Sequence, residues 1–184
     1  MGMTRRPRPA ATLVILLSIV GAIGCGPVEA THPGTHDATS HHPFDNAAYW
    51  SSVFDDPKRD AWQKPDAVVA ALDLRAGMWV ADLGAGTGYF SRRLAQAVAP
   101  GVLFAVETEP NLVTHLRARA EREQTPNVVP VLASPTNPRL PPAALDLVLI
   151  VDTYHHIDDR LAYFRRLHAA LKPDGRVAIV DWHK

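Results

Sequence analysis

The chain has 184 residues, of which 47% are hydrophobic and 21% are charged. These values are typical of a globular protein that can bury a core, and the length suits one domain with an appendage. The formal net charge is zero, so we expect no nucleic acid or other polyanionic partner. The single cysteine, Cys25, excludes a disulfide framework or a cysteine-based metal site within one chain.

Residues 1–25 differ from the rest of the chain. Three arginines within residues 5–8 precede an uncharged run at 10–23 that is rich in Leu, Ile and Val. This run is short for a helix that must cross a hydrocarbon core about 30 Å thick. It does suit the apolar region of a secretory signal. The sequence Ala22-Ile23-Gly24-Cys25 resembles a bacterial lipoprotein signal, which implies lipidation of Cys25 and a membrane-associated protein facing outside the cytoplasm. The alternatives are an uncleaved membrane anchor, or a misplaced start codon upstream of a cytoplasmic enzyme.

Residues 26–43 are predicted to form a linker, because they contain Pro, Gly, Thr, Ser and Asp but almost no large apolar residue. Loose metal binding by their histidines is one interpretation. A polar tether is favoured, since no fixed scaffold would hold the ligands. The histidines concerned are His32, His36, His41 and His42. The next segment, 44–64, is aromatic, and we expect it to cap a ligand pocket or to pack on the edge of a domain spanning 44–184.

From residue 65 onward, helical and strand patterns alternate. Apolar residues four apart, such as Phe90, Leu94 and Val98, indicate an amphipathic helix. The almost uninterrupted apolar run at 145–151 indicates a central strand that is covered on both faces. We expect helices at 65–72, 89–98, 111–123 and 160–171, strands at 78–83, 102–106, 128–132, 145–151 and 176–180, and a turn at 172–175. Such alternation predicts an α/β fold, a Rossmann-like parallel sheet with helices on both faces.

A glycine-rich loop lies between the first of these strands and the helix that follows. Gly84, Gly86 and Gly88 have the spacing G-x-G-x-G, whereas dinucleotide sites use G-x-G-x-x-G and would need glycine where Tyr89 stands. Glycine allows a positive φ and close approach of a ligand. Asp82 precedes the loop and can meet an ammonium group. This combination favours S-adenosylmethionine, which carries an amino acid and no pyrophosphate.

An acidic residue, Glu107, ends the second strand, 21 residues after Gly86. A carboxylate at this place can accept hydrogen bonds from both ribose hydroxyls of a nucleoside. Glu109 is a nearby competitor for this role.

Together with the runs at 145–149 and 171–176, these motifs resemble those of class I S-adenosylmethionine-dependent methyltransferases that act on small molecules. The resemblance covers about residues 50–184. It implies that the three loop glycines surround the methionine part of the cofactor and that Glu107 holds the ribose. Many family members place an Asp after the third strand, near the adenine. Here residues 133–137 offer Thr136 or Asn137 instead.

The acceptor site is expected beyond the carboxyl end of the fourth strand. Titratable side chains are densest there, at Asp152, Tyr154, His155 and His156. Histidine can act as a base near neutral pH, so His155 and His156 are catalytic candidates, and Asp152 could orient one of them or contact the cofactor. Alternatively, the histidine pair is structural or lines the cofactor pocket. No metal site is predicted in the domain.

Members of this family usually have seven strands, the last two following the fifth as an antiparallel hairpin. This chain ends at Lys184, so we expect these two strands to be absent and a sheet edge to be left unpaired. A secretory signal also conflicts with a cofactor that is not expected to be abundant outside the cytoplasm. Our first hypothesis is a methyltransferase with a small-molecule acceptor. A membrane-tethered non-catalytic binder or inactive fragment is the second, and the glycine spacing disfavours a dehydrogenase. The sequence determines neither the acceptor nor the oligomeric state.

Overall fold

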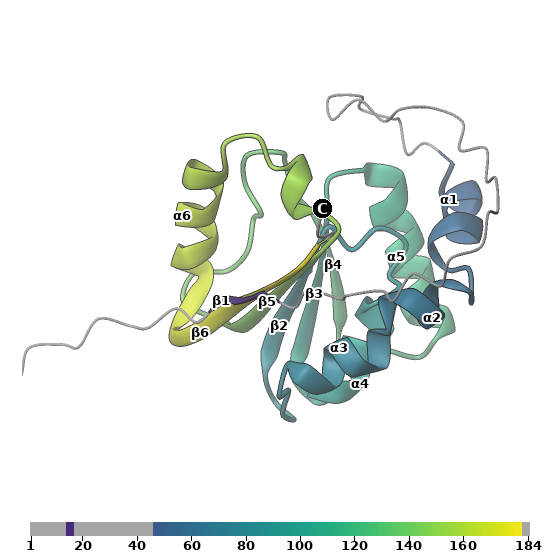
Figure 1. Ribbon diagram of the computed structural model, residues 1–184, viewed down its shortest axis with the longest axis horizontal. Helices are drawn as coiled ribbons and strands as arrows, with labels where there is room; N and C mark the ends of the chain where they lie inside the picture. The colour runs from purple at the N-terminus through teal and green to yellow at the C-terminus, as the bar shows by residue number, and fades with distance from the viewer. Residues whose placement is uncertain (1–13, 17–45, 182–184) are drawn as a thin grey trace, which may run out of the picture.

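The computed structural model describes residues 14–16 and 46–181 (Figure 1). The interpretations that concern Cys25 and the four linker histidines therefore lie outside the described residues. Among the helices that are described, none combines the length and the apolar character needed to cross a bilayer.

A single parallel sheet forms the centre of the domain, with the strand order β1-β6-β5-β2-β3-β4. Five of the strands fall where the sequence predicts them. The strands are β1 (Val14–Leu16), β2 (Trp79–Leu83), β3 (Val102–Glu107), β4 (Val128–Leu132), β5 (Leu145–Val151) and β6 (Leu171–Val180). The Rossmann-like α/β prediction is confirmed.

Helices cover both faces of the sheet, as predicted (Figure 1). They are α1 (Ala47–Phe54), α2 (Arg59–Gln63), α3 (Pro65–Ala71), α4 (Ser91–Val98), α5 (Pro110–Arg122) and α6 (Arg160–Ala170), with a short 3₁₀ turn, η1 (Tyr154–His156). Helices α3 and α4 bury Val68, Leu94 and Val98 against one face of the sheet. Helix α6 buries Tyr163 and Leu167 against the other.

The chain reverses its direction of travel across the sheet between β2 and β5. From β2 it moves outward to β3 and β4, and it then returns to β5 and moves the other way to β6. The loops after β2 and β5 therefore diverge at the carboxyl ends of two neighbouring strands. Ligands of open α/β sheets bind in the crevice at such a point.

Two details of the β6 region differ from expectation. The turn predicted at 172–175 lies within β6, where the pairing with β5 jumps from Leu145–Leu171 to Leu147–Arg176 and accommodates the extra residues as an irregularity. The outer edge of β6 was expected to be unpaired. Instead, Val14, Ile15 and Leu16 pair with it in parallel register through Val177, Ala178 and Ile179.

Candidate functional site

The glycine loop follows β2 at the reversal point. Gly84, Gly86 and Gly88 have φ angles of +75°, +56° and +93°, in the left-handed region that favours glycine. A Cβ atom on Gly84 would overlap the side chain of Thr153, which follows β5, so the two loops pack directly on each other. A Cβ atom on Gly86 would lie 3.7 Å from the ring of Phe54. The glycines thus allow neighbouring side chains to pack directly on this loop, which we call the glycine cradle (Gly84–Gly88).

Glu107 is held against this loop from the end of β3. Its Oε2 accepts a hydrogen bond of 2.9 Å from the backbone N–H of Gly86, and its Oε1 accepts one of 2.6 Å from the backbone N–H of Thr108. The loop is tied to β3 as well, since the N–H groups of Gly84 and Ala85 both donate to the carbonyl of Val106. The structure therefore brings together the glycine loop and the acidic residue that the sequence singled out.

Asp82 lies buried at the base of the loop. Its carboxylate accepts a hydrogen bond of 2.7 Å from the hydroxyl of Ser91. The pKa of Asp82 is raised to about 6, mainly by burial and also by the nearby charge of Glu107, whereas Ser91 and Arg59 oppose the shift. A desolvated carboxylate of this kind gains from a cationic ligand group more than an exposed one does.

Arg59 of α2 covers the loop from the other side, and the sequence analysis missed it. Its guanidinium stacks over the ring of Tyr89 at 4.2 Å, donates to the carbonyl of Phe54 at 3.0 Å and lies 3.5 Å from Asp152. The Arg59 and Asp152 side chains are only 16% and 25% exposed. The aromatic residues at 44–64 were expected to cap a pocket or to pack on the domain edge, and Phe54 from this segment lies beside Gly86. No sequence pattern indicated Arg59.

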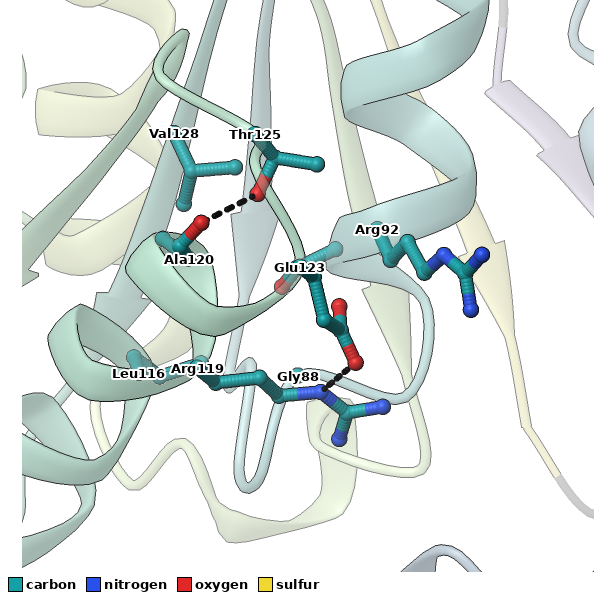
Figure 2. Close-up of a pocket in the computed structure, with 9 residues that line it drawn as sticks. Gly88, Arg92, Leu116, Arg119, Ala120, Glu123, Thr125 and Val128 are labelled. Atoms are coloured by element: carbon teal, nitrogen blue, oxygen red, sulfur yellow. Dashed lines mark hydrogen bonds and ion pairs between the residues drawn. The ribbon is translucent and has the colours of Figure 1, made fainter.

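A second contact fixes α1 to the rear of the loop. Asp55 accepts hydrogen bonds from the hydroxyl of Thr87 and from Arg119, and Arg119 also donates to the carbonyl of Thr87. Figure 2 shows Arg119 reaching Glu123 beside a cavity of about 10 Å³ between α4 and α5. This space is about the size of one water molecule, so it is too small to be a ligand site.

The titratable residues that follow β5 lie where β5 and β6 end. Asp152 follows β5 with a φ of +49°, and its N–H donates to the carbonyl of Val180. Burial raises the pKa of Asp152, although the charge of Arg59 opposes the shift. Nδ1 of His155 lies 3.2 Å from Oδ2 of Asp181, and the ring of His156 lies 4.2 Å from that of His155. The sequence analysis missed Asp181, because it follows another strand, β6, and has no motif of its own.

Thr136 is placed differently from the other predicted site residues. It is exposed in a tight turn that is closed by paired hydrogen bonds between Ser134 and Asn137, and its carbonyl accepts a hydrogen bond from Arg166. None of the contacts recorded for Thr136 joins it to the glycine loop or to Glu107. Its role at the adenine stays a prediction.

Comparison with known proteins assigns the chain to a family. Residues 80–175, just over half of the chain, match the family described as methyltransferase domain. The chain belongs to this methyltransferase family. A structure described as a SAM dependent methyltransferase from Aquifex aeolicus is similar, with a TM-score of 0.69, 25% identity, and coverage of 74% of this chain and 73% of that one. S-adenosylmethionine is the cofactor of this methyltransferase family.

Two curated relatives have different acceptors in their names. A protein-L-isoaspartate O-methyltransferase of Methanothrix thermoacetophila is 33% identical over 109 residues, covering 59% of this chain and 49% of the relative. A 27-O-demethylrifamycin SV methyltransferase of Amycolatopsis mediterranei is 27% identical over 135 residues, covering 73% of this chain and 49% of the relative. The chain thus spans about half the length of both relatives.

Proposed function

We propose that this chain transfers a methyl group from S-adenosylmethionine to a small-molecule acceptor at the reversal point of the sheet. The observation that carries the proposal is the Gly84–Gly88 cradle, with Glu107 bonded to its centre through the N–H of Gly86. S-adenosylmethionine supplies a methyl group on a positively charged sulfur, so the protein's own task is to orient the acceptor and to handle its proton.

The cofactor contacts are proposed from the positions of the surrounding groups. Gly84, Gly86 and Gly88 would surround the methionine part of the cofactor, and the buried carboxylate of Asp82 would face its ammonium group. The Glu107 carboxylate has further lone pairs, which can accept hydrogen bonds from the ribose hydroxyls. Asp152 lines the same crevice, and Thr136 remains the candidate for the adenine.

We propose that Arg59 contributes to binding the carboxylate of the methionine part of the cofactor. The Arg59 side chain is only 16% exposed, and its bonds to Asp152 and Gln63 are long, at 3.5 and 3.4 Å. A charge-assisted pair with a carboxylate prefers about 2.7–2.9 Å, so these contacts leave the guanidinium able to form a stronger one.

A small acceptor is favoured over a macromolecule by the cover that α1 and α2 place over the loop. Phe54 faces Gly86, and Asp55 is anchored by Thr87 and Arg119. The net charge of zero gives no attraction for a polyanion. The rifamycin-modifying relative, whose name describes a small molecule, is consistent with this choice.

Calorimetric titration of the full chain with S-adenosylmethionine, with NAD as the control, tests the cofactor assignment. We expect micromolar affinity for the former and no heat of binding for the latter. Formation of S-adenosylhomocysteine with a panel of small acceptors then tests transfer. Binding of NAD alone, or of neither compound, would contradict the proposal.

Membrane attachment through Cys25 also remains a proposal, supported by the lipoprotein-like sequence at 22–25. Detergent phase partitioning of the expressed chain and of a Cys25→Ser variant tests it. Equal partitioning of the two proteins into the aqueous phase would contradict lipidation and leave the cytoplasmic alternative.

A further inference from the structure

A carboxylate and an imidazole meet at the carboxyl ends of β5 and β6. The two strands are parallel neighbours, with Val151 paired to Val180. Asp181 follows β6 directly, and His155 lies in η1 just after β5. Nδ1 of His155 lies 3.2 and 3.3 Å from the two carboxylate oxygens of Asp181. The register of the sheet therefore delivers both groups to the same edge.

The backbone around this pair is held in place. The N–H of Asp152 donates to the carbonyl of Val180 at 2.9 Å, which joins the two strand ends beyond their last paired residues. The N–H of His156 donates to the carbonyl of Thr153 at 3.0 Å and closes η1. The backbone that carries His155 and Asp181 is therefore held in place. A residue that transfers a proton needs such fixed positioning.

The pair also lies beside the cofactor loop. Thr153, two residues before His155, packs so tightly on Gly84 that a Cβ there would overlap its side chain. His155 continues from this contact and is 47% exposed, whereas Asp181 is 20% exposed. The imidazole is thus open to a solute while its carboxylate partner is mostly enclosed.

A carboxylate that accepts a hydrogen bond from Nδ1–H selects one tautomer of histidine and leaves a lone pair on Nε2. It also stabilises the imidazolium that forms when Nε2 takes up a proton. This arrangement is useful to a methyl acceptor that must lose a proton. It offers nothing to a carboxylate acceptor, which is already a nucleophile at neutral pH.

We propose that His155, positioned by Asp181, is the base that deprotonates the methyl acceptor, so that the acceptor's nucleophile is an O–H or N–H group. The inference rests on the methyltransferase function proposed above and names its acceptor class. An O–H bond of the acceptor, or an N–H bond of its ammonium form, breaks, the proton moves to Nε2 of His155, and the electron pair stays on the acceptor atom. The proton later leaves to water. His155 is the catalytic residue and Asp181 the positioning residue.

The first test reads the histidine directly and needs no acceptor. Long-range ¹H–¹⁵N correlation spectra of the ¹⁵N-labelled full chain at pH 8 are expected to show His155 as the Nδ1–H tautomer. Asp181→Asn should shift His155 toward the Nε2–H tautomer, and His168→Gln, on the exposed face of α6, should leave the His155 signals unchanged. An Nε2–H tautomer in the unaltered protein, or no response to Asp181→Asn, would overturn the pairing.

The second test measures S-adenosylhomocysteine formation with catechol, ethanolamine and benzoate. Turnover of catechol or ethanolamine is expected. For that acceptor, His155→Ala should lower kcat by about 100-fold with little change in KM, with partial rescue by added imidazole. Asp181→Asn should lower kcat less, and Asp181→Glu should restore part of it. Turnover confined to benzoate, no turnover of catechol or ethanolamine, or an unchanged kcat in His155→Ala would overturn the acceptor class.

Calorimetry with S-adenosylmethionine separates this inference from the function on which it rests. His155→Ala and Asp181→Asn are expected to bind the cofactor within about twofold of the unaltered chain, because neither residue belongs to the glycine cradle. Absence of cofactor binding by the unaltered chain would refute the proposed function. The tautomer of His155 would still show whether Asp181 positions the imidazole.

Discussion

The two edges of the sheet both carry charged side chains but hold them in different surroundings. At the amino edge, Asp73 and Arg75 pair at 2.9 Å while remaining 67% and 72% exposed. At the carboxyl edge, Arg59 and Asp152 are 16% and 25% exposed. A hollow of about 440 Å³ also lies at the amino edge. It is lined by Asp73, Arg75, Met78, Asp146, Lys172, Pro173, Asp174 and Arg176.

The size of a hollow therefore does not mark the functional edge of this protein. The charges around this hollow are balanced, and its ion pairs, Asp73–Arg75 and Asp146–Lys172, are exposed or partly exposed to solvent. Exposed ion pairs contribute about 0–1 kcal/mol. The carboxyl edge instead holds a fully enclosed carboxylate, Asp82, and three glycines in left-handed conformations. Buried charge stabilises the fold poorly by itself, and enclosed carboxylates with a raised pKa are common at functional sites.

The largest expected effect that separates the two edges comes from Glu107. Glu107→Ala removes the proposed ribose acceptor and the bond to Gly86, so we expect the Kd for S-adenosylmethionine to rise by about 100-fold. Isothermal titration calorimetry measures the change. Glu109→Ala, two residues further on, should alter the Kd by less than about threefold. The reverse ranking would assign the ribose to Glu109.

Asp82 provides the next largest effect, through stability. Burial raises the pKa of Asp82 from its ordinary value of 3.8 to about 6, so the folded protein binds a proton between these values that the unfolded chain does not. Stability contributed by this group is fully present below about pH 4 and is lost as the pH rises through 6. Asp82→Asn should therefore raise the free energy of unfolding by about 3 kcal/mol at pH 8 and by little at pH 4.

Urea denaturation of the cofactor-free chain at the two pH values measures this difference. Asp73→Asn at the amino edge is the control and should change the stability by less than about 0.5 kcal/mol at either pH. A gain for Asp82→Asn that is independent of pH would contradict the electrostatic explanation.

The smallest effect compares one arginine from each edge. Arg59→Met should weaken S-adenosylmethionine binding by about tenfold, because it removes the charge that we assign to the methionine carboxylate. Arg75→Met should change the Kd by less than about twofold. Calorimetry on both variants, with circular dichroism to verify folding, provides the comparison. Equal effects would remove Arg59 from the cofactor site.

Most of the fold could be predicted because the buried elements have strong local patterns. The apolar run at 145–151 and the four-residue spacing of Phe90, Leu94 and Val98 correspond to β5 and to the region of α4. The region at 172–175 could not be predicted, because a Pro-Asp-Gly sequence is typical of a turn. The pairing of Leu145 with Leu171 instead keeps that segment in the sheet as an irregularity.

The site was predictable where one segment of chain carries the chemistry. Gly84, Gly86 and Gly88 are identified by their spacing, and Glu107 by its distance from them. Arg59 and Asp181 were missed because their functions depend on neighbours that are 93 and 26 residues away, Asp152 and His155. Only the register of the sheet and the docking of α2 bring such groups together.

The contact between Thr153 and Gly84 has a thermodynamic consequence. Because these two side-by-side loops share no free space, a shift of the segment that carries His155 must displace the backbone that cradles the cofactor. If binding of the acceptor requires free energy to move Thr153, the affinity for the cofactor then changes as well. Linkage requires the two ligands to affect each other by the same factor. The packing of Thr153 on Gly84 therefore provides a route by which the affinities for the two ligands depend on each other.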